Sequence, residues 1–285
     1  MVNFGVMMFP TDKAMDPMQL AVEAEERGFE SLWFPEHSHI PTSRESPWGL
    51  RKEAPPLPEE YWRTNDQFIA LAMAGAVTNT IKLGTGITLV AQRDPIWLAK
   101  EVATIDALTG GRFMLGIGYG WNKEELEHHG VAFGDRRAVV RENILAMKEI
   151  WANDEAEFHG EHVDFSKIWS WPKPAQKPHP PIILGGAAGP KTLAHIVEFC
   201  DGFMPIGGRH GFAAQIAGLR QAAEEAGRDM DTFDLGEFGT PAKPEVVESL
   251  IEEGIHRIVF GLPPADADTV MTQLDKYAEF MASYS

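Results

Sequence analysis

The chain has 285 residues and a formal net charge of −17 at pH 7. This acidic balance argues against nucleic-acid binding, which depends on clustered Lys and Arg. No segment approaches the roughly 20 apolar residues of a membrane-spanning helix, and the first residues, MVNFGVMMFP, lack the pattern of a signal peptide. With a single cysteine, Cys200, the composition predicts a cytoplasmic protein without disulfides, whose cysteine is a small buried hydrophobe.

Short apolar segments alternate with amphipathic helical patterns along the whole chain. The predicted strands cover residues 3–8, 31–34, 82–89, 112–117, 181–184, 202–205, 234–238 and 257–260. The predicted helices cover residues 17–27, 66–79, 95–108, 136–151, 190–199, 211–226, 244–252 and 266–281. Strict strand–helix alternation indicates a parallel sheet with helices outside it. The number of pairs and the chain length favour one closed (β/α)8 barrel over residues 1–285, with an open doubly wound sheet as the alternative.

Two insertions interrupt this alternation. Residues 37–64 follow the second strand, contain five prolines and are too long for a plain connection, so they are predicted to form a lid or binding loop. Residues 155–181 lie between the fourth helix and the fifth strand and begin with a predicted hairpin, AEFHGEHVDF, that turns at Gly160. Each insertion is too short to bury a core of its own.

The C-terminal ends of the strands are where (β/α)8 enzymes bind their ligands. In this chain these ends are rich in glycine and apolar residues, and glycine lets a flat ligand approach the backbone. Such a surface suits a heteroaromatic ring better than a sugar or a polyanion. The tryptophans predicted to lie near the ligand or in the lid are Trp48, Trp62 and Trp121.

The fifth strand end has the pattern of a phosphate site. PPIILGGAAGPKTL reads as an apolar strand, a glycine-rich turn and a helix that begins near Pro190. N–H groups at a helix start face an anion and the helix dipole favours it, and Lys191 would add charge. A turn that is glycine-rich only for barrel geometry is the alternative.

His37 follows the second strand directly and is the candidate for proton transfer, because imidazole titrates nearest to neutral pH. Glu36 beside it is the candidate to orient or tune it. A histidine that merely hydrogen-bonds loop backbone is the structural alternative. His39, His128 and His129 lack the spacing of metal ligands, so no metal site is predicted, and the latter two are expected at the end of a short helix.

Several segments together resemble one family. FGVMMFP, AEERGFESLWFPEH, IKLGTGITL, DALTGGRFMLGIGYGWNKEEL and KPHPPIILGGAA are similar, in this order and over nearly the whole chain, to the bacterial luciferase-like superfamily. Within it they look most like the branch that uses the deazaflavin coenzyme F420. The resemblance implies an oxidoreductase that transfers a hydride between F420 and a small organic substrate, and a homodimer packed through outer helices.

The resemblance also implies roles for individual residues. A non-prolyl cis peptide is expected between Gly86 and Ile87, where it would support one face of the ring. His37 would lie near the reacting ring carbon, Asn122 would contact the ring or the ribityl chain, and the fifth strand's turn would hold the phosphate. Together with the strand-end residues, the predicted cofactor-binding set is Met8, His37, Gly86, Ile87, Thr88, Gly118, Tyr119, Asn122, Gly185, Gly186, Ala187 and Ala188.

Two departures from the family pattern bear on the cofactor. Many flavin-using relatives have an Arg where this chain has Tyr119, and many have Ser or Thr where it has Ala187. Phosphate binding would then depend on backbone N–H groups, with Lys191 or Arg209 assisting. Both departures favour F420. An FMN-dependent monooxygenase is the second hypothesis, and a flavin- or deazaflavin-binding protein without turnover is the third.

Overall fold

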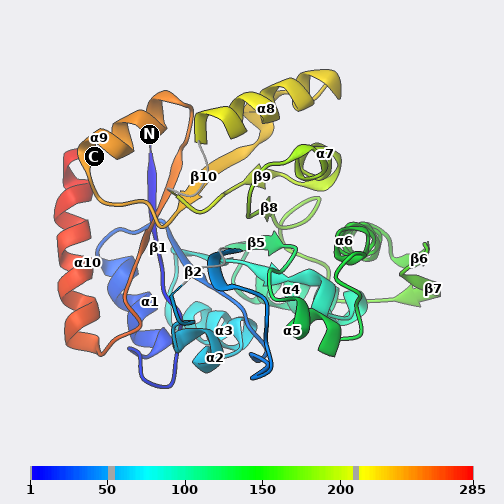
Figure 1. The fold of residues 1–285 in the computed structure, drawn as a ribbon, viewed down its shortest axis with the longest axis horizontal. Coiled ribbons are helices and arrows are strands. Elements are labelled where there is room, and N and C mark those ends of the chain that lie inside the picture. Colours follow the sequence, from blue (N-terminus) through cyan, green and yellow to red (C-terminus); the bar gives the residue numbers. More distant parts are fainter. Residues whose placement is uncertain (1, 51–54, 208–211, 285) are drawn as a thin grey trace.

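The computed structural model describes residues 2–50, 55–207 and 212–284. Its barrel strands are β1 (Asn3–Met7), β2 (Ser31–Phe34), β3 (Lys82–Thr85), β4 (Thr88–Leu89), β5 (Phe113–Gly118), β8 (Ile182–Leu184), β9 (Gly202–Phe203), β10 (Asp234–Phe238) and β11 (Arg257–Gly261). They are hydrogen-bonded in the order β3-β2-β1-β11-β10-β9-β8-β5-β4, and β3 also pairs with β5, so the sheet closes (Figure 1). All of these pairs are parallel. Because β3 and β4 share one position, this confirms the predicted (β/α)8 barrel.

Helices surround the barrel and begin where the sequence predicts. Asp16, Asp66, Asp94 and Asp266 each accept backbone N–H bonds at a helix start, which satisfies donors that the helix cannot pair internally. The outer helices are α1 (Pro17–Glu26), α3 (Gln67–Val77), α4 (Pro95–Leu108), α6 (Arg136–Ala152), α7 (Pro190–Phe199), α8 (Phe212–Glu225), α9 (Pro244–Glu252) and α10 (Ala267–Met281).

The prediction of one continuous strand over residues 82–89 is wrong, because this segment forms two strands. It is split into β3 and β4 at Gly86–Ile87, where the peptide bond is cis. Two further cis bonds, Trp171–Pro172 and Lys177–Pro178, lie in the second insertion.

The insertions contain short elements of their own. The first, residues 37–64, is called the lid loop below and includes a 3-10 turn, η1 (Trp48–Leu50), and α2 (Glu60–Arg63). The second begins with the hairpin β6 (Glu155–His159) and β7 (Asp164–Trp169), and the N–H of Gly160 donates to the Val163 carbonyl, 2.8 Å, as predicted for the turn. A short helix, α5 (Lys123–His128), follows β5. The remaining 3-10 turns are η2 (Val90–Gln92), η3 (Met230–Thr232) and η4 (Ala282–Tyr284).

The core has two layers. One fills the space between sheet and helices and includes Cys200, which is 1% exposed and whose thiol pKa is raised by burial. The other fills the barrel axis and is called the barrel plug below. It consists of Trp33, Met114, Ile183, Met204, Phe238 and Val259. Among the described helices, none has the length and apolar character needed to cross a membrane.

Candidate functional site

The predicted site residues come from neighbouring positions around the barrel mouth. β2 pairs with β3, β3 and β4 pair with β5, and β5 pairs with β8. His37, Gly86, Asn122 and Gly185 follow or end these strands in that order. At about 4.8 Å between strands, the row spans about 15 Å, enough for a ring at one end and a phosphate group at the other.

Ile87, which follows the cis peptide bond, lies across this row. Ile87 packs against the barrel plug, and Gly86 lies above Trp33, Phe238 and Met7. A methyl group on Gly118 would lie 2.5 Å from Cδ1 of Ile87, and one on Gly185 would lie 2.8 Å from its Cγ2. Two predicted ligand-facing glycines therefore make room for the Ile87 side chain, a reason that the sequence did not show.

His37 is held by a carboxylate that the sequence reasoning missed. Its Nδ1 lies 2.8 Å from Oε2 of Glu125, and the side chains are 6% and 0% exposed. The other carboxylate oxygen of Glu125 accepts the N–H of Ser38, 3.2 Å. α5 therefore positions the ring of His37. The sequence feature that could have identified Glu125 was the KEEL segment after the glycine motif, in which Glu125 lies beside Leu126, which is buried.

The prediction that Glu36 orients His37 is not supported by its contacts. The Glu36 carboxylate accepts the N–H of Leu89, 2.6 Å, and Nε of Arg93, 2.7 Å. Arg93 also contacts Asp66 and Glu101, 3.2 and 2.9 Å, and this set of carboxylates raises its pKa although burial opposes the charge. Glu36 thus ties the start of the lid loop to the helices behind it.

Aromatic side chains enclose His37. Its ring centroid lies 5.2 Å from that of Tyr61 and 5.9 Å from that of Trp121. Tyr61 also contacts Phe9, 4.8 Å, and Trp48, 5.9 Å. These four residues, Phe9, Trp48, Tyr61 and Trp121, are called the aromatic cluster below.

The prediction for the three tryptophans near the ligand or in the lid is therefore partly wrong. Trp48 and Trp121 belong to the aromatic cluster, whereas Trp62 is 50% exposed and Tyr61 beside it takes the inner position. Arg44, with its Cζ 5.5 Å from the Trp121 ring, is a cation at the edge of the cluster.

Asn122 is the unexplained polar group of the site. It is 1% exposed, and neither Oδ1 nor Nδ2 has a hydrogen-bond partner within the part of the chain that the structure describes. Buried amides are nearly always paired, so this position fits a polar ligand group. Two other residues predicted to bind the cofactor, Met8 and Thr88, have partners within the protein. Met8 packs in the layer outside the sheet, while Met7 faces the plug. The Thr88 hydroxyl accepts a hydrogen bond from Nε2 of Gln67, 3.0 Å.

The turn before α7 offers fewer free donors than predicted. The N–H of Gly185 donates to the Ile117 carbonyl, 2.8 Å, and that of Ala188 donates to Oε1 of Gln215, 2.9 Å. The N–H groups of Gly186, whose φ is 118°, and Ala187 have no acceptor in residues 2–50, 55–207 and 212–284. Lys191 is exposed in the first turn of α7, and Arg209 lies outside the described residues.

Arg137 of α6 is a second residue that the sequence reasoning missed. Its guanidinium lies 4.1 Å from the Tyr119 ring, and its Nη1 donates to the hydroxyl of Thr192 in the first turn of α7, 3.0 Å. The Tyr119 hydroxyl lies 2.9 Å from Nδ1 of His195, and burial, opposed by Arg137, raises the pKa of Tyr119 to about 12. Tyr119 is therefore neutral, and its ring packs against the guanidinium of Arg137. The sequence feature that could have identified Arg137 was a pair of arginines at the start of a predicted helix.

His39, His128 and His129 help to fasten the lid loop to α5. Nε2 of His39 lies 2.9 Å from Nδ1 of His128, and Ser38 Oγ lies 2.7 Å from Nε2 of His129. His128 ends α5 and His129 follows it, which confirms their predicted position. Among the described residues, no group of three or more His, Cys, Asp or Glu is arranged to hold a metal ion.

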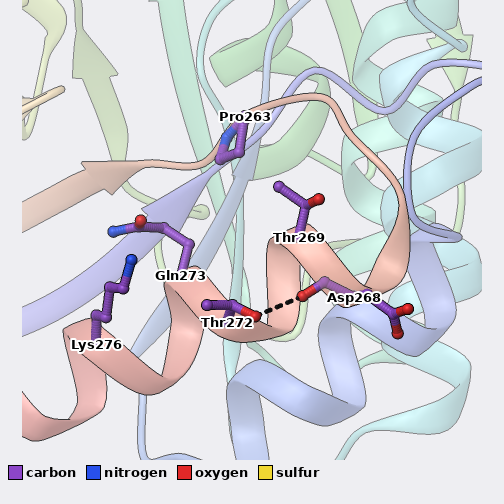
Figure 2. A pocket seen from close by; sticks show the side chains of 6 residues that line it. All are labelled: Pro263, Asp268, Thr269, Thr272, Gln273 and Lys276. Carbon is purple, nitrogen blue, oxygen red and sulfur yellow. Dashed lines mark hydrogen bonds between the residues drawn. The ribbon is translucent and has the colours of Figure 1, made fainter.

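Two surface hollows lie away from His37. One, of about 360 Å³, is formed by Pro263 and the outer face of α10 (Figure 2). The other, of about 120 Å³, lies between the β1 connection and α2 and is lined by Thr11, Lys13, Glu59, Glu60, Arg63 and Pro264. Neither includes the aromatic cluster or the turn before α7.

Known families and proteins match the chain over most of its length. A family profile described as luciferase-like monooxygenase matches residues 5–279. An uncharacterised protein of Mycobacterium tuberculosis is 34% identical over 281 residues, 99% of each chain. An F420-dependent glucose-6-phosphate dehydrogenase of Nakamurella multipartita is 29% identical over 75% of this chain and 60% of its own.

Solved structures share the fold. Monooxygenase RslO1 from Streptomyces bottropensis has a TM-score of 0.79 at 19% identity, with 99% of each chain covered. The coenzyme F420-dependent tetrahydromethanopterin reductase from Methanopyrus kandleri has a TM-score of 0.76 at 19% identity, again with 99% of each chain covered. By the profile match and the 34% identical relative, the chain belongs to the luciferase-like monooxygenase family.

Proposed function

We propose that this oxidoreductase transfers a hydride between coenzyme F420 and a small organic substrate. The observation that carries the proposal is Asn122, a buried amide between the His37 position and the turn before α7, whose two polar atoms find no partner among the described residues. An F420-dependent relative and a structural neighbour with F420 in its name support the cofactor class.

The residues present fit such a cofactor. Asn122 would satisfy polar atoms of the ring or the ribityl chain. The N–H groups of Gly186 and Ala187, which have no acceptor among the described residues, would donate to a phosphate oxygen, as backbone donors at a helix start do. Arg137 faces the same first turn of α7 and has no carboxylate partner in the described ranges. Arg137 would supply the positive charge that Tyr119 lacks at the position where many flavin-using relatives have an arginine.

The chain's own residues would handle substrate and proton. F420 supplies a hydride donor or acceptor when bound. His37 has its Nδ1 committed to Glu125, so Nε2 is the nitrogen left to give or take a proton at the substrate. The aromatic cluster would exclude water and hold a flat or apolar substrate, and Arg44 at its edge would accept an anionic one.

The second candidate is an FMN-dependent monooxygenase, favoured by the family's name. Arg137 is compatible with both candidates, because it would hold the FMN phosphate equally well. Reduced FMN added anaerobically and then exposed to oxygen would give a peroxyflavin-type absorbance transient in that case. For the third candidate, a binding protein without turnover, His37→Ala would leave cofactor affinity unchanged with no activity to lose.

Cofactor titration tests the proposal. Quenching of deazaflavin fluorescence is expected to show micromolar binding of F420. Arg137→Ala is expected to weaken F420 binding by about 10- to 100-fold, the effect of a lost charge-assisted hydrogen bond. It should leave binding of the deazaflavin riboside without phosphate unchanged.

Arg141→Ala is the matched control, because Arg141 lies one turn further along α6 and pairs with Glu198 on the surface. Its F420 affinity should stay within about 2-fold of the wild type, as for other exposed ion pairs. Absence of F420 binding at micromolar concentration would refute the proposed function. If both variants weakened F420 binding equally, Arg137 would not be a phosphate-binding residue.

A further inference from the structure

Arg44 of the lid loop is a half-buried cation without a carboxylate partner in the described ranges. Its Cζ lies 5.5 Å from the Trp121 ring, and its Nη1 donates to the carbonyl of Ser46. A guanidinium carries several N–H donors in a planar fork, so donors remain available for a ligand. The charge of Arg44 is therefore balanced by no described residue beside it.

Arg63 and Arg93, in contrast, are paired with carboxylates. Arg63 contacts Asp12, 2.7 Å, and Glu59, 3.1 Å. Arg93 contacts Glu36 and two further carboxylates. The chain has 42 acidic and 25 basic residues, so a cation without a carboxylate beside it is a local exception to the negative charge. Arg44 can attract an anion where the net charge of −17 would otherwise repel one.

The first turn of α5 holds the backbone next to Arg44. Oε1 of Glu124 accepts the N–H groups of Glu45 and Ser46, 2.9 and 3.1 Å, and the N–H of Lys123 donates to Oγ of Ser46, 3.1 Å. Burial opposes the charge of Glu124, but hydrogen bonds from Ser46 and Glu45 lower its pKa to about 2. Glu124 is thus ionised at neutral pH, and its carboxylate is committed to this turn. A fixed turn reduces the ordering cost of ligand binding at Arg44.

Trp121 is in contact with both His37 and Arg44. Its ring centroid lies 5.9 Å from that of His37 and 5.5 Å from Cζ of Arg44. Tyr61 joins Trp121 to the rest of the aromatic cluster, at 6.3 Å between ring centroids. A flat ligand that packs along Trp121 can therefore reach the proton-transfer candidate with one end and the cation with the other.

We propose that the substrate is a flat aromatic carboxylate whose acid group binds Arg44 and whose reacting carbon lies at His37, a proposal that rests on the proposed function. The planar fork of a guanidinium matches a carboxylate in a bidentate pair. The aromatic body would pack on the aromatic cluster, where ring contacts are favourable. A dianionic phosphate would call for more than one cation, and among the described residues Arg44 is the one cation placed over a ring of this cluster.

A purely structural role of Arg44 makes a different prediction. If Arg44 only holds Trp121 and Ser46 in place, its loss weakens neutral and anionic ligands to the same extent. If Arg44 binds the acid group, its loss weakens the anionic ligand alone. An acid and its own primary amide separate the two roles, because they share a shape and differ in charge.

Isothermal titration calorimetry of the F420-loaded protein tests the proposal with benzoate, trans-cinnamate and 2-naphthoate and with the primary amide of each acid. The acid that binds best is expected to bind at least ~10-fold more tightly than its amide, the effect of a charge-assisted pair. Arg44→Gln should reduce this preference to less than about 2-fold and leave the affinity of the amide unchanged. Arg44→Lys keeps the charge without the fork and should give an intermediate preference.

Arg63→Gln is the matched control in the same lid loop, because Arg63 is paired with Asp12 and Glu59. It should keep the full preference for the acid, since exposed ion pairs contribute little. Circular dichroism would show that all three variants are folded.

The proposal is overturned if no acid binds more tightly than its amide, which includes the case in which no acid binds. It is also overturned if Arg44→Gln weakens acid and amide alike, or if 2-naphthyl phosphate binds more tightly than 2-naphthoate. The same titrations without F420 keep the two proposals apart. If F420 itself does not bind, the proposed function fails, whereas the preference for acid over amide still decides the role of Arg44.

Discussion

His37 and Glu125 form the contact on which the proposed chemistry depends at the scale of single residues. The two side chains are almost fully buried, and the carboxylate reaches the ring from a helix 88 positions further along the chain. Because Glu125 also binds the N–H of Ser38, it fixes both the ring and the backbone next to it. Glu125 is thus a positioning residue, which acts through His37.

Glu125→Gln is expected to lower kcat by about 100-fold, a typical contribution of a positioned acid or base. The amide keeps the shape but removes the negative charge that faces Nδ1 of His37. KM and F420 affinity should change less than about 2-fold, measured by steady-state kinetics and fluorescence titration. Glu127→Gln, on the exposed side of α5 and 3.6 Å from Lys123, is the control and should retain full activity. An unchanged kcat in Glu125→Gln would show that the pair is structural.

The element that shapes the proposed ring site is the break between β3 and β4. Ile87 leaves this break and occupies space that Gly118 on β5 and Gly185 after β8 leave open. Three strand ends therefore share one side chain. A substitution at either glycine acts on the site through Ile87.

Gly118→Ala is expected to weaken F420 binding by at least ~10-fold, because the new methyl group meets Ile87 at 2.5 Å. Gly134→Ala is the control: nothing lies within 4 Å of an added methyl group there, and its affinity should be unchanged. Circular dichroism would show that both variants are folded. The same contact should lower the thermal midpoint of Gly118→Ala, and the double variant Ile87→Ala/Gly118→Ala should regain part of that loss. Failure to regain it would place the clash elsewhere.

At the scale of the whole molecule, a buried ion-pair network lies at one end of the barrel and the proposed active site lies at the other. At the N-terminal ends of the strands, Arg257 is buried between Glu30 and Asp234. Burial alone would raise the pKa of Asp234, but hydrogen bonds and charge from His256 and Arg257 lower it to about 2. At the C-terminal ends lie His37, Asn122 and the turn before α7, as is usual for this fold.

Arg257→Ala is expected to lower the free energy of unfolding by about 3 kcal/mol at pH 7, because it removes the buried cation between two largely buried carboxylates and leaves them the more exposed Lys82 and His256. A lowered folded-state pKa contributes stability above the unfolded value, 3.8 for Asp234, and that contribution is lost as pH falls toward about 2. The difference between variant and wild type should therefore shrink below pH 4 in urea denaturation. A difference independent of pH would contradict this account. Arg141→Ala, which removes an exposed pair, should cost less than about 1 kcal/mol.

Much of the fold and part of the site followed from sequence alone. Helices such as Pro95–Leu108 and Pro190–Phe199 and the strand Ser31–Phe34 have the predicted bounds, because hydrophobic period and capping residues act locally. The alternation of strands and helices then left a closed barrel as the favoured arrangement, and the barrel placed His37 and the turn before α7 at one end.

Only the tertiary structure decided which side chains meet. Glu125 rather than Glu36 contacts His37, Tyr61 rather than Trp62 faces it, and Arg137 reaches Thr192 across 55 positions. The glycines at positions 118 and 185 likewise make room for a side chain from another strand. Such contacts depend on how neighbouring strand ends and helices pack together, and a local pattern of residues carries no record of its distant partner.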